Sequence, residues 1–231
     1  MATRYNYTGG IVTNGLVQNL DAAKLDSYPN TGSAWFDISG NNKNATLTNG
    51  PIFTGVSKQA SIAFDGSDDY ATFTPCIPQS TPTYTIEAWW KADSFRTQVI
   101  WEQNTSWYEQ GRRSCMLLLS NGNGGFNGES ADFHNEVPYS VNTWYQWVIT
   151  IDTNLVSNII KLYRNGSLYT QGNPYNNYPL NIGAYYGNIG RKWIGGELFD
   201  GNVAITRAYN RVLTAAEVSQ NFNAVRGRFG I

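Results

Sequence analysis

Residues 84–91 read YTIEAWWK, and polar and apolar side chains alternate along them. Successive side chains of a β-strand point to opposite faces of its sheet, so this alternation predicts a strand with one face in a core. The residues that share the predicted buried face are Tyr84, Ile86, Ala88 and Trp90. Residues 144–151 (WYQWVITI) repeat the pattern, and their shared face carries Tyr145, Trp147, Ile149 and Ile151.

A β-hairpin is predicted after these two strands. Residues 159–164 and 167–170 flank Asn165-Gly166, a pair that supplies the positive φ angles of a type I′ turn. Shorter strand candidates, separated by clusters of Gly, Asn and Pro, lie at residues 61–64, 70–73, 99–101, 116–119, 180–182 and 203–209. Many short strands with turn signals and little helix predict an all-β antiparallel sandwich.

One short α-helix is predicted near the C-terminus. Thr214 is its N-cap, and Glu217 three residues later completes a capping box. Leu213 and Val218 have the spacing of a hydrophobic staple, and Gly227 is expected to end the helix. We expect the helix to pack on the outside of the sandwich as a structural clasp.

The composition excludes several classes of protein. A single sandwich domain can fill 231 residues, and the 41% of hydrophobic residues are enough to bury a core, which excludes global disorder. Charged residues make up 14% of the chain and the formal net charge is −1, so no basic field for binding nucleic acid is present. No stretch approaches the ~20 apolar residues of a membrane-spanning helix, and residues 1–10 do not resemble a signal peptide.

The cysteines and the single histidine restrict the chemistry further. Cys76 and Cys115 form no C-x-x-C motif and have no histidines at zinc-binding spacing. We interpret them as two unpaired thiols, with one disulfide as the alternative. Because His134 is the only histidine, a His-based metal cage is excluded, and a Ser-His-Asp triad would have to use that residue.

An ordered set of motifs runs along the chain: residues 15–22 (GLVQNLDA), 35–41 (WFDISGN), 64–70 (FDGSDDY), 85–89 (TIEAW), 142–145 (NTWY), 162–166 (LYRNG) and 209–218 (YNRVLTAAEV). Together they resemble a known family, the laminin-G-like branch of the concanavalin-A-like lectin/glucanase jelly rolls. The resemblance implies a jelly-roll domain over residues 15–231. Residues 1–14 precede it and show no core pattern, and we expect them to form an N-terminal arm that packs on a partner.

The last residues suggest a biological setting. Residues 221–231 (NFNAVRGRFGI) are similar to the ending of laminin-G-like proteins of tailed bacteriophages, many of which are virion structural proteins. The lack of a signal peptide agrees with assembly inside a host cell. The resemblance implies a non-enzymatic structural or decoration protein of the virion, in capsid or tail, whose partners are other virion proteins or host-surface glycans. The alternative is a carbohydrate-binding adhesin of a tail fibre, and self-association stays open in both cases.

Hydrolysis was considered because related jelly-roll glucanases carry an E-x-D-x-x-E pattern on a strand. Such enzymes need two carboxylates that flank the scissile bond, and residues two apart on a strand share a face. Glu129 and Asp132 are three apart, which on a strand points them to opposite faces. We interpret the segment that holds them, with His134 and Glu136, as a polar loop. We therefore expect no catalytic residues and no enzyme activity.

A calcium site was considered at Asp65, Asp68 and Asp69, whose clustered oxygens suit a hard cation. Relatives pair such a turn with an acid on the penultimate strand, where this chain has Ala204 and Ile205. We therefore expect a solvated turn and no cofactor, with bound calcium as the alternative.

The remaining candidates are aromatic and basic residues in or beside loops. Aromatic rings stack on the apolar faces of sugars, and Tyr, Trp and Arg equally dominate protein–protein contacts. Both kinds of contact stay open, and for two of the tryptophans, at 101 and 193, burial in the core is a further alternative. The candidates are Trp101, Trp107, Tyr108, Arg112, Arg113, Tyr185, Tyr186, Arg191 and Trp193.

Overall fold

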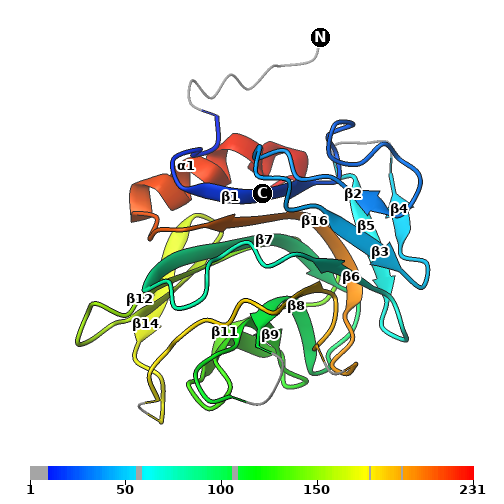
Figure 1. Ribbon diagram of the computed structural model, residues 1–231. Helices are drawn as coiled ribbons and strands as arrows, with labels where there is room; N and C mark the ends of the chain where they lie inside the picture. The colour runs from blue at the N-terminus through cyan, green and yellow to red at the C-terminus, as the bar shows by residue number, and fades with distance from the viewer. Residues whose placement is uncertain (1–9, 56–58, 106–108, 177, 194) are drawn as a thin grey trace.

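The computed structural model describes residues 10–55, 59–105, 109–176, 178–193 and 195–231, which form two stacked antiparallel sheets and one helix (Figure 1). Sheet A contains, in spatial order, β14 (Ser167–Gly172), β13 (Ile160–Arg164), β12 (Tyr145–Asp152), β7 (Thr83–Ala92), β16 (Asp200–Tyr209), β5 (Ser61–Asp65) and β4 (Ile52–Thr54). One further strand, β1 (Leu16–Asp21), pairs with the second half of β16. This architecture confirms the predicted sandwich.

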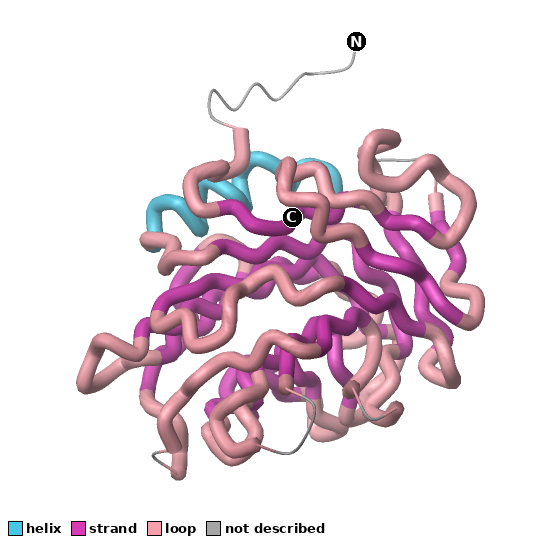
Figure 2. Tube along the Cα trace, viewed as in Figure 1, coloured by secondary structure: helices cyan, strands magenta, loops and turns pink. Residues whose placement is uncertain are grey.

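Sheet B faces sheet A across the core (Figure 2). Its strands, in spatial order, are β11 (Phe133–Pro138), β10 (Asn123–Asn127), β9 (Ser114–Leu118), β8 (Gln98–Asn104), β15 (Tyr186–Ile189), β6 (Tyr70–Phe73), β3 (Ala45–Thr48) and β2 (Ala34–Trp35). One continuous cluster of buried apolar side chains draws on both sheets. The chain therefore folds around a single core.

The core confirms the two faces that residue alternation predicts. The alternate residues of β7 and β12 named above all belong to the buried cluster. Trp90 of β7 meets Trp147 of β12 edge to face, with ring centroids 4.9 Å apart. Aromatic pairs favour this geometry because the positive ring edge meets the negative ring face.

Helix α1 (Ala215–Val225) packs on the outer face of sheet A, as predicted (Figure 1). Thr214 and Glu217 form the expected capping box. Phe222 stacks on Trp89 of β7 at 5.7 Å between ring centroids. Helix α1 ends at Val225 with Arg226 as its C-cap, directly before Gly227 as expected, and the 3₁₀ turn η1 (Arg226–Arg228) then brings Phe229 onto Trp89 at 4.5 Å.

Two segments differ from the sequence-based expectations. Residues 180–182 are not a strand, and β11 takes the place of the predicted polar loop. Its partner β10 is rich in glycine, and the alternation rule cannot detect such a strand. Gly124 is needed there because a Cβ at this position would lie 2.4 Å from the carbonyl oxygen of Leu117 and 2.9 Å from the ring of Trp147.

The N-terminal segment is described from Gly10 onward. Residues 10–14, which were assigned to an arm, lie against their own domain: the Val12 amide donates to Asn221 Oδ1 at 2.8 Å, and Val12 is buried. An arm that reaches a partner is thus restricted to residues 1–9, which lie outside the described residues, and stays a prediction. Cys76 and Cys115 are buried and unpaired with each other. In the described part of the chain, no helix is long and apolar enough to cross a membrane.

Candidate functional site

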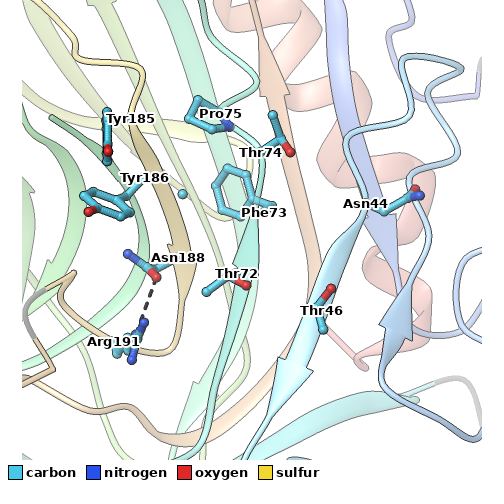
Figure 3. A pocket seen from close by; sticks show the side chains of 11 residues that line it. Asn44, Thr46, Thr72, Phe73, Thr74, Pro75, Tyr185, Tyr186, Asn188 and Arg191 are labelled. Carbon is cyan, nitrogen blue, oxygen red and sulfur yellow. Dashed lines mark hydrogen bonds between the residues drawn. The ribbon is translucent and has the colours of Figure 1, made fainter. Parts of the chain in front are cut away.

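A pocket of about 410 Å³ opens on the outer face of sheet B, over β3, β6 and β15 (Figure 3). Ala45 and Ala71 point into the core, so the alternate residues Thr46, Thr72 and Asn188 point outward. These three residues form one row, because Thr72 pairs with Thr46 on one side and with Asn188 on the other. The volume is within the range of about 300–1,000 Å³ that small-molecule sites occupy.

Aromatic rings form one wall of the pocket. Tyr185 and Tyr186, at the start of β15, are 63% and 37% exposed, and their ring centroids lie 4.5 Å apart. Tyr186 also stacks on Trp193 at 5.4 Å, with the two ring planes 16° apart. The two contacts hold the Tyr186 ring in a defined orientation, while more than a third of its surface stays open to solvent.

The cation at the pocket is Arg191. Its guanidinium lies over the ring of Tyr70, 3.4 Å from the ring centroid. Its Nε approaches Asn188 Oδ1 at 3.5 Å (Figure 3). A cation over an aromatic face is attracted by the quadrupole of the ring. The ring and the amide therefore position a charged side chain that would otherwise move freely.

Hydroxyl and amide groups complete the pocket. None of the described lining residues carries a carboxylate or an imidazole. Hydroxyls and amides both donate and accept hydrogen bonds, so they suit a ligand with many hydroxyl groups. The lining residues are Asn44, Thr46, Thr72, Phe73, Thr74, Pro75, Tyr185, Tyr186, Gly187, Asn188 and Arg191.

A buried ionic network lies next to the pocket on the same sheet face. Arg113 is 2% exposed, and its guanidinium lies 3.5 Å from the carboxylate of Glu102. The same guanidinium lies 3.6 Å from Glu129 and 3.4 Å from Glu197. It also donates to Asn127 Oδ1 at 2.8 Å. The network links β8, β9 and β10 to the loop before β16.

Glu102 is the most enclosed carboxylate of this network. Burial raises its pKa, and the positive charge of Arg113 acts in the opposite direction. Glu102 pairs in register with Asn188, so the network and the pocket meet at this strand pair. Because Glu102 is fully buried, it has no access to a ligand in the pocket.

Four of the sequence-predicted contact residues come together at the pocket: Tyr185, Tyr186, Arg191 and Trp193. Asn44, Thr46, Thr72 and Asn188 were missed. The two threonines had one signal, the alternation of threonine with apolar residues in 45–48 (ATLT) and 70–73 (YATF), which marks an outward hydroxyl row only once the strand pairing is known. The two asparagines lie outside these stretches.

Other predicted contact residues lie elsewhere. Trp101 is fully buried, because a register shift between Val99 and Trp101 turns it into the core, where it stacks on Phe73 at 5.6 Å. Arg113 is buried in the network described above, so neither residue offers a contact surface. Arg112 forms an ion pair with Glu109 at 2.7 Å. Trp107 and Tyr108 lie outside the described residues.

The acidic segment considered for hydrolysis does not reach the pocket. Glu129 lies in a turn and contacts Arg113. His134 Nε2 is 3.8 Å from Asp132, and Glu136 accepts a hydrogen bond from the Tyr175 hydroxyl. None of the four acidic and histidine side chains of this segment lines the described pocket.

The aspartate cluster lies in the turn between β5 and β6. Ligand oxygens of Asp65, Asp68 and Asp69 lie within 4.8 Å of one another. Asp65 Oδ1 accepts the amide hydrogens of Ser67 and Asp68, and Asp69 Oδ2 accepts that of Asp65. The hydrogen bond from Ser67 is the main cause that lowers the pKa of Asp65. The carboxylates thus stabilise their own turn, which explains the cluster without a metal; bound calcium stays the untested alternative.

A laminin G family model, described as the concanavalin A-like lectin/glucanases superfamily, matches residues 65–219. The match covers more than half of the chain. The protein belongs to the concanavalin A-like lectin/glucanases superfamily. This finding agrees with the resemblance on which the sequence analysis relied. No curated protein sequence matches this superfamily member.

Solved structures share the fold of this concanavalin A-like domain. Trypanosoma rangeli sialidase in complex with sialic acid aligns with a TM-score of 0.66 and 17% identity, over 93% of this chain and 33% of the sialidase. Domain 4 of the arabinanase AbnA from Geobacillus stearothermophilus, in complex with arabinotriose, aligns with a TM-score of 0.61 and 16% identity, over 89% of this chain and 97% of that domain.

Botulinum neurotoxin type C, whose cell entry depends on two ganglioside molecules, aligns with a TM-score of 0.66 and 12% identity. The alignment covers 93% of this chain and 52% of the neurotoxin chain. This concanavalin A-like domain therefore spans about a third of the sialidase and about half of the neurotoxin chain. At these identities the likeness concerns the fold alone.

Proposed function

We propose that this domain is a non-catalytic carbohydrate-binding module whose binding site is the pocket beside Tyr185 and Tyr186. The observation that carries the proposal is the pairing of exposed, oriented aromatic rings with a wall of hydroxyl and amide groups. A sugar offers an apolar ring face to the aromatics and hydroxyls to the polar wall. Protein pockets for small ligands commonly combine these two kinds of surface.

Two of the aligned structures support this proposal. The AbnA domain was solved with arabinotriose, and the neurotoxin depends on ganglioside molecules. The AbnA domain matches this chain over nearly its whole length, so the two units are of comparable extent. Arabinotriose and gangliosides are ligands of those two proteins. They indicate that carbohydrates are the class of ligand to test on this chain.

The absence of catalysis is part of the proposal. Glycoside hydrolysis needs two carboxylic groups that flank the bond to be cleaved, and the described residues that line this pocket include none. The nearest buried acid, Glu102, is enclosed in an ionic network. We therefore expect a bound oligosaccharide to be released unchanged.

A glycan array followed by isothermal titration with the best-bound oligosaccharide tests the proposal. We expect Tyr186→Ala to weaken binding about tenfold or more, because an aromatic contact at the centre of a site commonly contributes over 1 kcal/mol. Tyr178→Ala is the matched control, because Tyr178 has the same 37% exposure but does not line the pocket.

Weaker binding in Tyr186→Ala with unchanged binding in Tyr178→Ala supports a site in the pocket. Failure of the wild-type protein to bind any glycan on the array would exclude the proposal. Equal losses in the two variants would place the site elsewhere. Chromatography of the oligosaccharide after incubation checks that it is not cleaved.

A second proposal concerns the setting: that this domain is a structural or decoration component of a tailed-phage virion. It rests on the similarity of residues 221–231 to phage laminin-G-like proteins. The same exposed tyrosines would suit contacts with neighbouring virion proteins. Mass spectrometry of purified virions tests the proposal, and the absence of peptides from this chain would contradict it.

A further inference from the structure

Arg191 is a positioned cation that the protein leaves without an anion. Its guanidinium contacts the ring of Tyr70 and the amide of Asn188, and no carboxylate lies within ion-pair distance of it among the described residues. Its sequence neighbour Lys192, in contrast, pairs with Glu197 at 3.3 Å. The loop thus supplies a counter-ion to the lysine and none to the arginine.

The surroundings of Arg191 favour an anionic partner. The lining of the pocket is neutral apart from this guanidinium, so nothing there would repel a negative charge. Arg191 is partly buried, which reduces the screening of its charge by solvent. Asn188 is 2% exposed, and its Oδ1 accepts a hydrogen bond from Arg191. Its Nδ2 has no hydrogen-bond acceptor among the described residues. The site is therefore richer in donors than in acceptors.

We propose that the pocket selects glycans that carry a carboxylate-bearing sugar, with the carboxylate on Arg191 and the sugar ring beside Tyr186. A guanidinium and a carboxylate are both planar and can share two parallel hydrogen bonds. This inference rests on the proposed carbohydrate-binding function and narrows its ligand class. A carboxylate fits the flat guanidinium fork better than a single hydroxyl does, and it supplies the missing negative charge.

The test compares acidic probes with neutral counterparts of the same shape. The first pair is tri-galacturonic acid and its fully methyl-esterified form, and the second is 3′-sialyllactose and its methyl ester. We expect at least one acidic probe to bind tenfold or more tightly than its counterpart in titration calorimetry. Higher salt concentration should reduce this preference, because Arg191 is only partly buried and salt still screens its charge.

Arg191→Gln is the decisive variant. It should reduce binding of the preferred acidic probe about tenfold and weaken binding of the neutral probe much less. Arg191→Lys keeps the charge without the fork and should recover part of the loss. The matched control is Arg164→Gln, because Arg164 also lies over an aromatic ring, that of Tyr169 at 4.5 Å, but does not line the pocket. Circular dichroism and thermal melting verify that each variant folds.

The possible failures are distinguishable. If acidic and neutral probes bind equally, or Arg191→Gln weakens both alike, the carboxylate assignment is wrong while the carbohydrate-binding function stands. If a carrageenan tetrasaccharide, which carries sulfates and no carboxylate, binds through Arg191 and neither carboxylate probe does, the carboxylate assignment is also wrong. If neither the array nor these probes bind, the proposed function and this inference fall together.

Discussion

At the scale of single residues, the sandwich encloses two fully buried glutamates in opposite environments. The Glu87 carboxylate, beneath helix α1, accepts from Arg207 at 3.0 Å and from Asn221 at 2.8 Å. It also accepts from Gln146 at 2.9 Å and from the indole of Trp89 at 3.1 Å. A buried charge with this many donors is held by its partners, and removing it leaves Arg207 buried without a counter-ion.

The environment of Glu102 is much poorer in donors. Among the described residues, its only hydrogen bond comes from Asn104 at 3.3 Å, and its Oε2 has no partner. Burial raises the pKa of this carboxyl above its unfolded value, so the folded state takes up the proton more readily. Stability is therefore lost as the pH rises from the unfolded toward the folded pKa, and the raised pKa is a cost to stability at neutral pH.

We predict opposite results for two isosteric substitutions. Glu87→Gln should lower the free energy of unfolding by about 3 kcal/mol or more, because it breaks a buried ion pair. Glu102→Gln should leave it within about 1 kcal/mol of the wild-type value or raise it, because Arg113 keeps Glu129, Glu197 and Asn127 as partners. Urea titrations at pH 7 measure both, and equal losses in the two variants would contradict this account.

Single residues also show where sequence reasoning succeeded and failed. The cluster Tyr185, Tyr186, Arg191 and Trp193 could be found because its members are close in sequence. For Trp101 the sequence left a contact role and core burial open, because a β-bulge is invisible in a period-two pattern, and the structure shows core burial. Arg113 was taken for a surface residue because its three carboxylate partners come from distant segments.

At the scale of elements, helix α1 begins at an unusually well-connected cap. The two ends of the Glu217 carboxylate contact the Arg211 guanidinium at 2.6 and 2.9 Å. Glu217 also accepts the backbone amide of Thr214 at 2.8 Å. The hydrogen bonds from Arg211 are the main cause that lowers the pKa of Glu217 to about 2.

This cap predicts a stability difference that depends on pH. Because the folded pKa lies below the unfolded value, the contribution of Glu217 is complete above about pH 4.5 and disappears as the pH falls toward about 2. Glu217→Gln should cost about 1–2 kcal/mol at pH 7, a value reduced for solvent screening, and nothing near pH 2. Thermal unfolding from pH 2 to 7 measures the difference between the two proteins.

A control separates this effect from general charge removal. Asp93→Asn deletes an exposed carboxylate that lies 3.6 Å from Lys91. Pairs of this kind contribute little, so its stability difference from the wild type should stay below about 0.5 kcal/mol at every pH. A Glu217→Gln deficit that persists at pH 2 would show that the ion pair is not its source.

The strands and the helix differ in how clearly the local sequence predicts them. Strands β7, β12 and β13 alternate polar and apolar residues, and α1 carries its own cap, so local chemistry defined them. Strand β10 (NGGFN) has one large apolar residue, and β15 (YGNI) contains a glycine because a Cβ at Gly187 would lie 2.3 Å from the Phe73 ring. These two strands form because neighbouring strands supply their hydrogen-bond partners and pack closely against their glycines. A single sequence does not show which strands will be neighbours.

At the scale of the whole molecule, the continuous core implies that the two sheets unfold together. We predict one calorimetric transition whose measured enthalpy equals its van't Hoff enthalpy. The far-ultraviolet circular dichroism and the tryptophan fluorescence should share that midpoint, because the buried tryptophans lie in both sheets. Two separate transitions would contradict the existence of a single core.

Sheet order is the level that the sequence predicted least. Alternation determines which face of a strand is buried, but it does not identify the neighbouring strand. Strand β16 pairs with β7 along one edge and with β5 and then β1 along the other, although these partners are far apart in sequence. The pocket could not be predicted for the same reason, because its row of polar side chains forms only when β3, β6 and β15 pair.

The two ends of the described chain lie on one side of the molecule. Gly10 accepts a hydrogen bond from Gln220 of α1, and Ile231 packs beside Trp89, so both lie at the outer face of sheet A (Figure 1). The pocket opens on the opposite sheet. If several copies were attached to a support by either end, the pocket of each copy would face away from that support. Copies arrayed in this way could engage a sugar-coated surface together, and individually weak contacts would combine into strong adhesion.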